Sequence, residues 1–386
     1  MSGLLKTCHA PNRCNNLIVG GQCELMRLTA FKLVLVLTAS VVMSCKGKVE
    51  SAPAGDSGPG DMRGGSGGAP GHGGVGGDPV QGGAGGNGSP DDFFVRGNYQ
   101  SLETISAYYV GHSLLADIPD IVTHISNQMR STSFSFRQQN VPGAPLRWHW
   151  EQTGPGGAGT VQSGGFTHQI HEAVASGDYS HMIVTDSVPR GGTAAEDETA
   201  EYLGKIVAAA RQARPDVRLF YYETWPHITS GLPGHDPYNE DTVSPTRHLL
   251  WRERIDADAS MWERIVDRVN QENPPGPNGH NVQLIPAGRV LARVVDAVEA
   301  GQIQGFDELG DLFLDEIHAN RYGQFIVATT HAAIHTRRDP RDFDIDVITR
   351  YGSSYWNEEY ARPSDAVASA FLQVVYESVP VYYRDR

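Results

Sequence analysis

The feature that most constrains the fold of this chain is a regular alternation of strand-like and helix-like segments after residue 104. Short β-rich runs predict strands at 105–111, 133–141, 180–186, 217–225 and 281–288. Apolar residues at helical spacing predict helices at 115–131, 166–177, 196–213, 246–271, 289–301, 319–336 and 364–379. Strands that alternate with helices pair in parallel and are covered by helices on both faces. We therefore expect a three-layer α/β/α sandwich on a mainly parallel sheet of about five strands.

A glycine-rich stretch precedes this region. Residues 52–90 carry almost no apolar side chains, so burial cannot offset the entropy that ordering them would cost. The stretch has no strict Gly-X-Y period, which excludes a collagen helix. We interpret residues 46–92 as a flexible linker and residues 93–386 as the folded domain.

The residues before the linker have the organisation of an export signal. Arg27 and Lys32 accompany an apolar run at 33–43 that is too short to cross a membrane. The run ends in Val-Met-Ser-Cys, which resembles a bacterial lipobox. The resemblance implies cleavage before Cys45 and lipidation of that residue. The alternative is a plain signal peptide that leaves Cys45 as a free thiol.

This signal also sets the expected location and partners. We interpret residues 1–45 as an upstream extension followed by the signal peptide, with translation starting at Met26. The mature domain would then have no disulfide, and lipid on Cys45 would hold it in the bacterial cell envelope, at the outer membrane or in the periplasm. A net charge of −14 repels phosphate backbones, so nucleic acid is not an expected partner.

Polar residues interrupt the apolar pattern at two distant places. Ser113, in YYVGHSLLADIP, comes directly after the first predicted strand. Asp315 precedes His318 by three residues in LFLDEIHANRYGQF. A carboxylate can hold an imidazole through Nδ1–H and leave Nε2 free to take the proton of a serine hydroxyl. Because parallel sheets bind ligands beyond the carboxyl ends of their strands, the sequence predicts a Ser113–His318–Asp315 triad at that edge.

These two blocks resemble those of the SGNH-hydrolase superfamily, also called GDSL-like. Its first block is Gly-x-Ser after the first strand, which Gly111-His112-Ser113 matches. Its last block is Asp-x-x-His before an apolar helix, which Asp315 to His318 match. The resemblance covers about residues 104–335 and implies a flavodoxin-like fold and a serine esterase without a cofactor.

The resemblance also implies an oxyanion hole, which takes a glycine N–H from a second block and an asparagine from a third. Gly143, after the second predicted strand, matches the glycine. The third block here reads Val-Thr-Asp-Ser, with Asp186 and Ser187 and no asparagine. An ionised Asp186 would repel an oxyanion, whereas Ser187 or a backbone N–H could substitute. The chain therefore resembles an atypical branch of the superfamily, with these three residues as oxyanion or substrate contacts.

The same residues also allow other structural or functional roles. Ser113 could cap a helix, and Asp315 could cap the helix that follows it. His168 and His171 are three residues apart, but no acidic or cysteine partner is spaced with them, so we expect no metal site. The aromatic cluster at 148–150 could line a carbohydrate site or simply pack.

The sequence thus predicts an exported, lipid-anchored esterase that cleaves small acyl esters, with acetyl groups on carbohydrate as one candidate substrate. A non-catalytic lipoprotein that binds glycans or a partner through a degenerate site is the main alternative. A metal-dependent hydrolase is a third.

Overall fold

The computed structural model describes residues 90–95, 104–128, 132–151, 169–188, 191–233 and 244–383. These residues all belong to one compact unit that extends from Gln81 to Arg386. The predicted signal peptide, Cys45, most of the predicted linker and His168 lie outside the described residues. None of the helices described here combines the length and apolar character that crossing a lipid bilayer requires.

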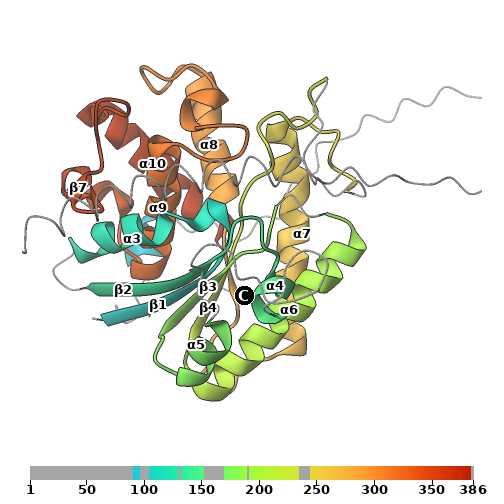
Figure 1. Ribbon diagram of the computed structural model, residues 1–386. Coiled ribbons are helices and arrows are strands. Elements are labelled where there is room, and N and C mark those ends of the chain that lie inside the picture. The colour runs from blue at the N-terminus through green and yellow to red at the C-terminus, as the bar shows by residue number, and fades with distance from the viewer. Residues whose placement is uncertain are drawn as a thin grey trace, which may run out of the picture. The chain divides into compact units, whose positions relative to one another are not determined.

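A parallel sheet of five strands lies at the centre of the described residues (Figure 1). Its strands are β1 (Thr104–Gly111), β2 (Ser133–Asn140), β3 (His181–Val184), β4 (Arg218–Tyr222) and β5 (Gln283–Ile285). Their order is β2-β1-β3-β4-β5, the doubly wound order of flavodoxin-like folds. The predicted fold class is therefore confirmed.

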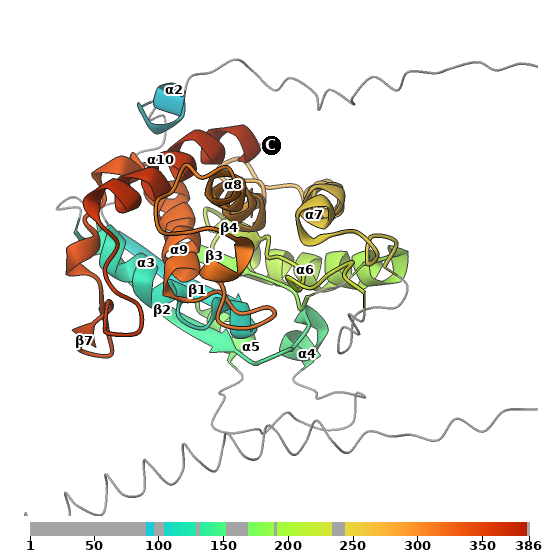
Figure 2. The same cartoon turned by 90° about the horizontal axis from the view of Figure 1, so that it is seen from above.

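Helices cover both faces of this sheet, which lies between the two groups in Figure 2. One face carries α3 (Ile118–Asn127), α8 (Ala287–Glu299) and α9 (Arg321–Thr336), with α10 (Asp365–Tyr382) packed on α8 and α9. The other carries α4 (Leu146–Glu151), α5 (Ile170–Ser176), α6 (Thr193–Ala213) and α7 (Trp251–Glu272). Each layer buries its own apolar cluster against the sheet, which is why β1, β3 and β4 carry apolar side chains on both faces.

Local sequence explains where several helices begin and end. The helix predicted from residue 115 begins at Ile118 as α3, because a 3-10 turn, η1 (Ser113–Leu115), precedes it. Pro119 lies in the first turn of α3, where a proline costs no hydrogen bond. Gly177 ends α5 in the left-handed region, with φ of +69°, which glycine adopts without strain.

Several short elements have no counterpart in the predicted pattern. They are α2 (Pro90–Val95), α4, η2 (Leu309–Leu312), η3 (Pro340–Asp342), η4 (Ile345–Val347) and a hairpin of β6 (Thr349–Arg350) and β7 (Ser353–Ser354). Helix α2 begins three residues before the predicted domain start at residue 93, and Phe94 stacks on Tyr376 of α10 with ring centroids 5.4 Å apart. Six or fewer residues are too few to show a periodicity, so tertiary contacts decide these elements.

Candidate active site

Ser113 lies on the turn that follows β1 at the carboxyl edge of the sheet. Gly111 ends the strand, and a Cβ at that position would lie 2.5 Å from Thr185 Cγ2 at the end of β3. Only glycine therefore lets β1 and the residue after β3 approach this closely. The register pairs Gly111 with Asn140 and Val110 with Val184, so β1, β2 and β3 end at the same edge as Ser113.

His112 holds this turn in place. Its imidazole accepts a long hydrogen bond from the Leu114 N–H, at 3.5 Å, and so caps η1. Its Nε2–H donates to the main-chain oxygen of Asp186 at 2.8 Å. Burial lowers the pKa of His112 to about 4, so the ring is neutral and has one donor and one acceptor nitrogen. The cap of the turn is thus His112, and the Ser113 hydroxyl is left for another contact.

The structure brings together the three residues of the predicted triad. His318 Nε2 lies 2.9 Å from Ser113 Oγ, although 205 residues separate them in sequence. His318 Nδ1 lies 2.8 Å from Asp315 Oδ2 and 3.1 Å from Oδ1. With Nδ1–H donating to the carboxylate, Nε2 is the acceptor that faces the serine hydroxyl. This is the orientation in which an imidazole can take the hydroxyl proton.

The turn around Asp315 keeps its carboxylate ionised. Burial alone would raise the pKa of Asp315, but its Oδ1 accepts the main-chain N–H groups of Ile317 and His318 at 2.9 and 2.8 Å. Together with the imidazole these donors lower the pKa below the ordinary aspartate value. An ionised Asp315 stabilises positive charge on His318.

Neighbouring loops fix this turn from outside. The indole Nε1–H of Trp225, three residues after β4, donates to the Ile317 main-chain oxygen at 2.7 Å. The Ile228 N–H donates to the Glu316 oxygen at 2.8 Å. Trp225 is the last residue of the strand predicted at 217–225, but nothing in the sequence assigns it a role, because its contact lies 92 residues away.

The helix after the turn is anchored as well. Asn320 caps α9 by accepting the N–H groups of Tyr322 and Gly323, and its amide donates to the Asp311 oxygen at 2.7 Å. A Cβ at Gly323 would lie 2.5 Å from the Leu312 oxygen, so this glycine allows α9 to pack close to the segment that leads into Asp315. The start of α9, three residues after His318, is thus held against the segment that leads into Asp315.

A small cavity opens beside the triad. Its volume is about 20 Å³, and its lining includes Ser113, Asp117, Ile118, Trp225, His318 and Gln324. A space of this size holds one water molecule or a group as small as a methyl.

Gly143 follows β2 near this edge. The Val141 N–H still donates to the Gly111 oxygen at 2.9 Å, so the chain leaves the sheet only after that residue. Gly143 then turns with φ of +68°, which favours glycine. Among the described residues, no acceptor receives a hydrogen bond from the N–H groups of Ser113 and Gly143. Both groups are therefore available as donors to a ligand.

Asp186 and Ser187 lie at the end of β3 and are used differently. The buried Asp186 carboxylate accepts the N–H groups of Leu146 and Ser187 at 2.9 and 2.8 Å and the hydroxyl of Thr199. It therefore ties the start of α4 and the second turn of α6 to the sheet, on the face opposite α3 and α9. The Ser187 N–H, which the sequence predicted as an oxyanion donor, donates to the Asp186 carboxylate instead.

The other residues considered in the sequence pack against one another. His171 Nε2 lies 2.6 Å from the Trp150 main-chain oxygen, and the two rings are 4.4 Å apart. Trp150 thus joins α4 to α5. Within the part of the chain that the structure describes, no three His, Cys, Asp or Glu side chains are grouped so that they could hold a metal ion.

Comparisons with known proteins add little to this geometry. No protein-family model and no curated protein matches the chain. Among solved structures, it is similar to a DUF4886 family protein from Bacteroides uniformis ATCC 8492, with 14% sequence identity and a TM-score of 0.49. The match covers 72% of this chain and 95% of the other. A similarity at this level carries no information about activity.

Proposed function

We propose that this chain is a serine esterase that cleaves short acyl esters. The observation that carries the proposal is the continuous hydrogen-bond chain from Asp315 through His318 to the Ser113 hydroxyl. His318 Nε2 takes the hydroxyl proton while Ser113 Oγ attacks the ester carbonyl carbon. The imidazolium gives that proton to the oxygen of the leaving alcohol, and an acyl-serine forms. Water, deprotonated by the same imidazole, then releases the acid and restores Ser113.

Two features support the charge balance of these steps. The ionised Asp315 stabilises the imidazolium, as its lowered pKa allows. The N–H groups of Ser113 and Gly143 are the donors proposed for the oxyanion, because no described residue accepts from them. Asp186 stays outside the chemistry in this scheme, since its carboxylate is held by Leu146, Ser187 and Thr199.

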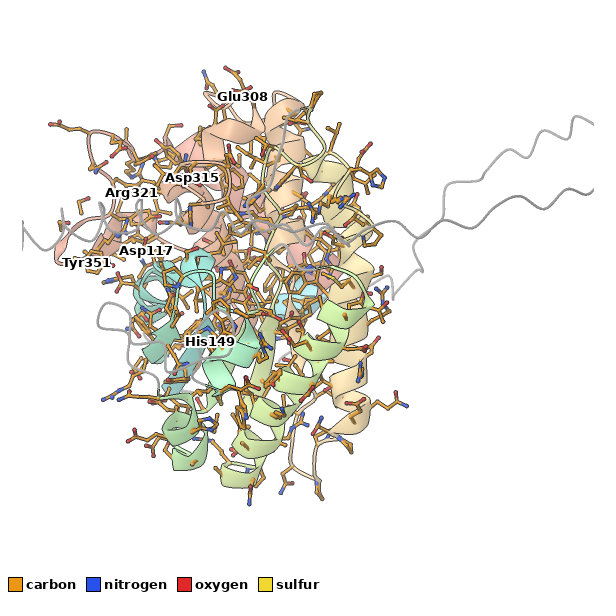
Figure 3. All side chains as sticks on the ribbon, turned by 45° about the vertical axis from the view of Figure 1, so that its right-hand side comes forward. Asp117, His149, Glu308, Asp315, Arg321 and Tyr351 are labelled. Atoms are coloured by element: carbon orange, nitrogen blue, oxygen red, sulfur yellow. The ribbon has the colours of Figure 1, made fainter. Side chains whose placement is uncertain are left out.

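An acetylated carbohydrate is the candidate substrate. The Tyr351 ring, at the tip of the β6–β7 hairpin, is 84% exposed, and its hydroxyl lies 3.2 Å from Asp117, which lines the cavity beside Ser113 (Figure 3). An exposed aromatic face beside a polar cavity is suited to stacking on a sugar ring while hydroxyl groups are hydrogen-bonded.

Export and lipid anchoring through Cys45 belong to the same proposal and rest on the sequence alone. Metabolic labelling with a radioactive fatty acid tests them. Incorporation of the label into the wild-type full chain, together with its loss in the Cys45→Ser variant, supports the anchor. Absence of label from both proteins contradicts it.

The rival function is a glycan- or partner-binding lipoprotein with an inactive site, which the missing third-block asparagine favours. A fluorophosphonate probe and p-nitrophenyl acetate separate the two. We expect the wild-type domain to be labelled and to hydrolyse the ester, and Ser113→Ala to lose both. Ser135→Ala, which removes an exposed hydroxyl of β2, is the matched control and should retain both. A wild-type protein that neither labels nor hydrolyses favours the binder.

A further inference from the structure

Trp225 lies between two small cavities. The first is the cavity of about 20 Å³ beside Ser113 and His318. The second has a similar volume, about 20 Å³, and its lining includes Val188, Pro226, Ile255, Met261 and Trp262. Trp225 is the residue that the two linings share. Trp225 therefore borders both the space at the nucleophile and the second cavity.

The Trp225 side chain is held rigidly. Trp225 is buried, and its Nε1–H donates to the Ile317 main-chain oxygen at 2.7 Å. Its ring meets Phe313 edge to face at 6.1 Å, and Trp251 meets the same Phe313 ring at 6.1 Å. A buried side chain with a hydrogen bond and an aromatic neighbour keeps one rotamer, so the wall does not open by side-chain motion alone.

The position of the triad decides which part of an ester faces this wall. His318 must reach the oxygen of the leaving alcohol, and the side chains of His318 and Asp315 are 38% and 51% exposed. The alcohol therefore leaves on the exposed side. The acyl group then occupies the cavity beside Ser113 Oγ, whose lining includes Trp225.

The second cavity has the chemistry of an alkyl site. Its lining combines apolar side chains, among them Val188, Ile255 and Met261, with two carboxylates that are paired with arginines. Glu223 pairs with Arg289 at 2.9 Å and Asp258 with Arg254 at 3.3 Å. Joined to the space at Ser113, it would accept methylene groups without leaving a buried charge exposed to them.

From this geometry we propose that Trp225 determines acyl-chain length. It restricts the enzyme to acyl groups about the size of acetyl, and its removal joins the two cavities into a channel for longer chains. The inference rests on the proposed esterase function. It makes Trp225 a specificity-determining residue, in addition to its hydrogen bond to Ile317 in the turn that carries Asp315 and His318.

The test compares kcat/KM for p-nitrophenyl acetate, butyrate and hexanoate. Each added methylene in an apolar pocket changes kcat/KM by about tenfold or more, so wild type should prefer acetate over hexanoate by at least about tenfold. Trp225→Ala should raise the hexanoate-to-acetate ratio by about tenfold or more. The variant also loses the hydrogen bond to the Ile317 oxygen. That loss should lower kcat/KM for all three esters by the same factor, which cancels in the ratio. Trp225→Leu, which keeps apolar bulk, should give a smaller shift and serves if the alanine variant does not fold.

Met261→Ala is the matched control, because it enlarges the second cavity and leaves the indole in place. Its ratio should equal that of wild type. Folded Trp225 variants with the wild-type ratio overturn the inference, as does a Met261→Ala shift equal to that of Trp225→Ala. If wild type hydrolyses none of the esters and takes no fluorophosphonate label, the proposed function itself fails, and the inference falls with it.

Discussion

The imidazole of His112 is joined to the main-chain oxygen of Asp186 by a 2.8 Å hydrogen bond. The turn that presents Ser113 is thereby tied to the end of β3. This bond links two strand ends across the sheet and leaves the Ser113 hydroxyl free to contact His318.

Replacement of His112 should therefore affect both stability and activity. His112→Phe keeps an aromatic ring but removes the 2.8 Å hydrogen bond to the buried Asp186 oxygen, which costs about 1–3 kcal/mol of the free energy of unfolding. The loosened turn should also lower kcat for p-nitrophenyl acetate. Urea denaturation measures the first effect. His248→Gln, at an exposed histidine, should stay within about 0.5 kcal/mol of wild type, and an equal loss there would contradict the argument.

Asp315→Asn should reduce kcat roughly 10²–10⁴-fold with little change in stability, because the amide cannot balance the imidazolium and favours the wrong tautomer of His318. Glu316→Gln removes the same charge from the same exposed turn without touching the imidazole and should keep wild-type kcat. Steady-state kinetics on both variants decide between an electrostatic role for Asp315 and a general effect of surface charge.

Stability should fall in acid because of buried neutral histidines. Burial lowers the pKa of His181 and His331 well below the ordinary value, and that of His335 to about 3, with Arg218 adding to the shift of His181 and His335. The unfolded chain takes up these protons below about pH 6.5, and the folded chain does not until far lower pH. Stability is therefore fully present above about pH 6.5 and is lost as the pH falls, by up to about 1.4 kcal/mol per pH unit for each histidine.

His335→Leu tests this origin. Both ring nitrogens of His335 are buried without a hydrogen bond, so leucine removes a titrating group and no bond. Urea unfolding between pH 8 and pH 5 should show a shallower acid loss than in wild type. Identical pH dependence in the two proteins would assign the loss to other groups.

Gly111→Ala should destabilise the fold by about 1–3 kcal/mol, because the added Cβ overlaps the Thr185 methyl at 2.5 Å. Thr185→Ser removes that methyl and keeps the hydroxyl that donates to the Tyr222 oxygen, so the double variant should recover much of the loss. Gly276→Ala, where a Cβ meets nothing within 4 Å, is the control for a glycine substitution without a clash. Additive losses in the double variant would argue against a Gly111–Thr185 contact.

The sequence alone was sufficient to predict the layered parallel sheet, because the periodicities of strands and helices are local properties of the chain. The sheet of β1 to β5 agrees with that prediction. The sequence also pointed to Ser113, because a serine follows the first predicted strand, and to Asp315 and His318, because their Asp-x-x-His spacing precedes an apolar helix. The short elements α4 and the β6–β7 hairpin left no such pattern.

Only the tertiary structure decided which hydrogen-bond partner each polar group has. It assigned the cap of the Ser113 turn to His112, engaged the Asp186 carboxylate with α4 and α6, and placed Trp225 against Ile317 across 92 residues. The physical reason is that a hydrogen bond depends on distance and direction in space. Packing of helices on both faces of the sheet sets those quantities, and residue type and spacing do not encode them.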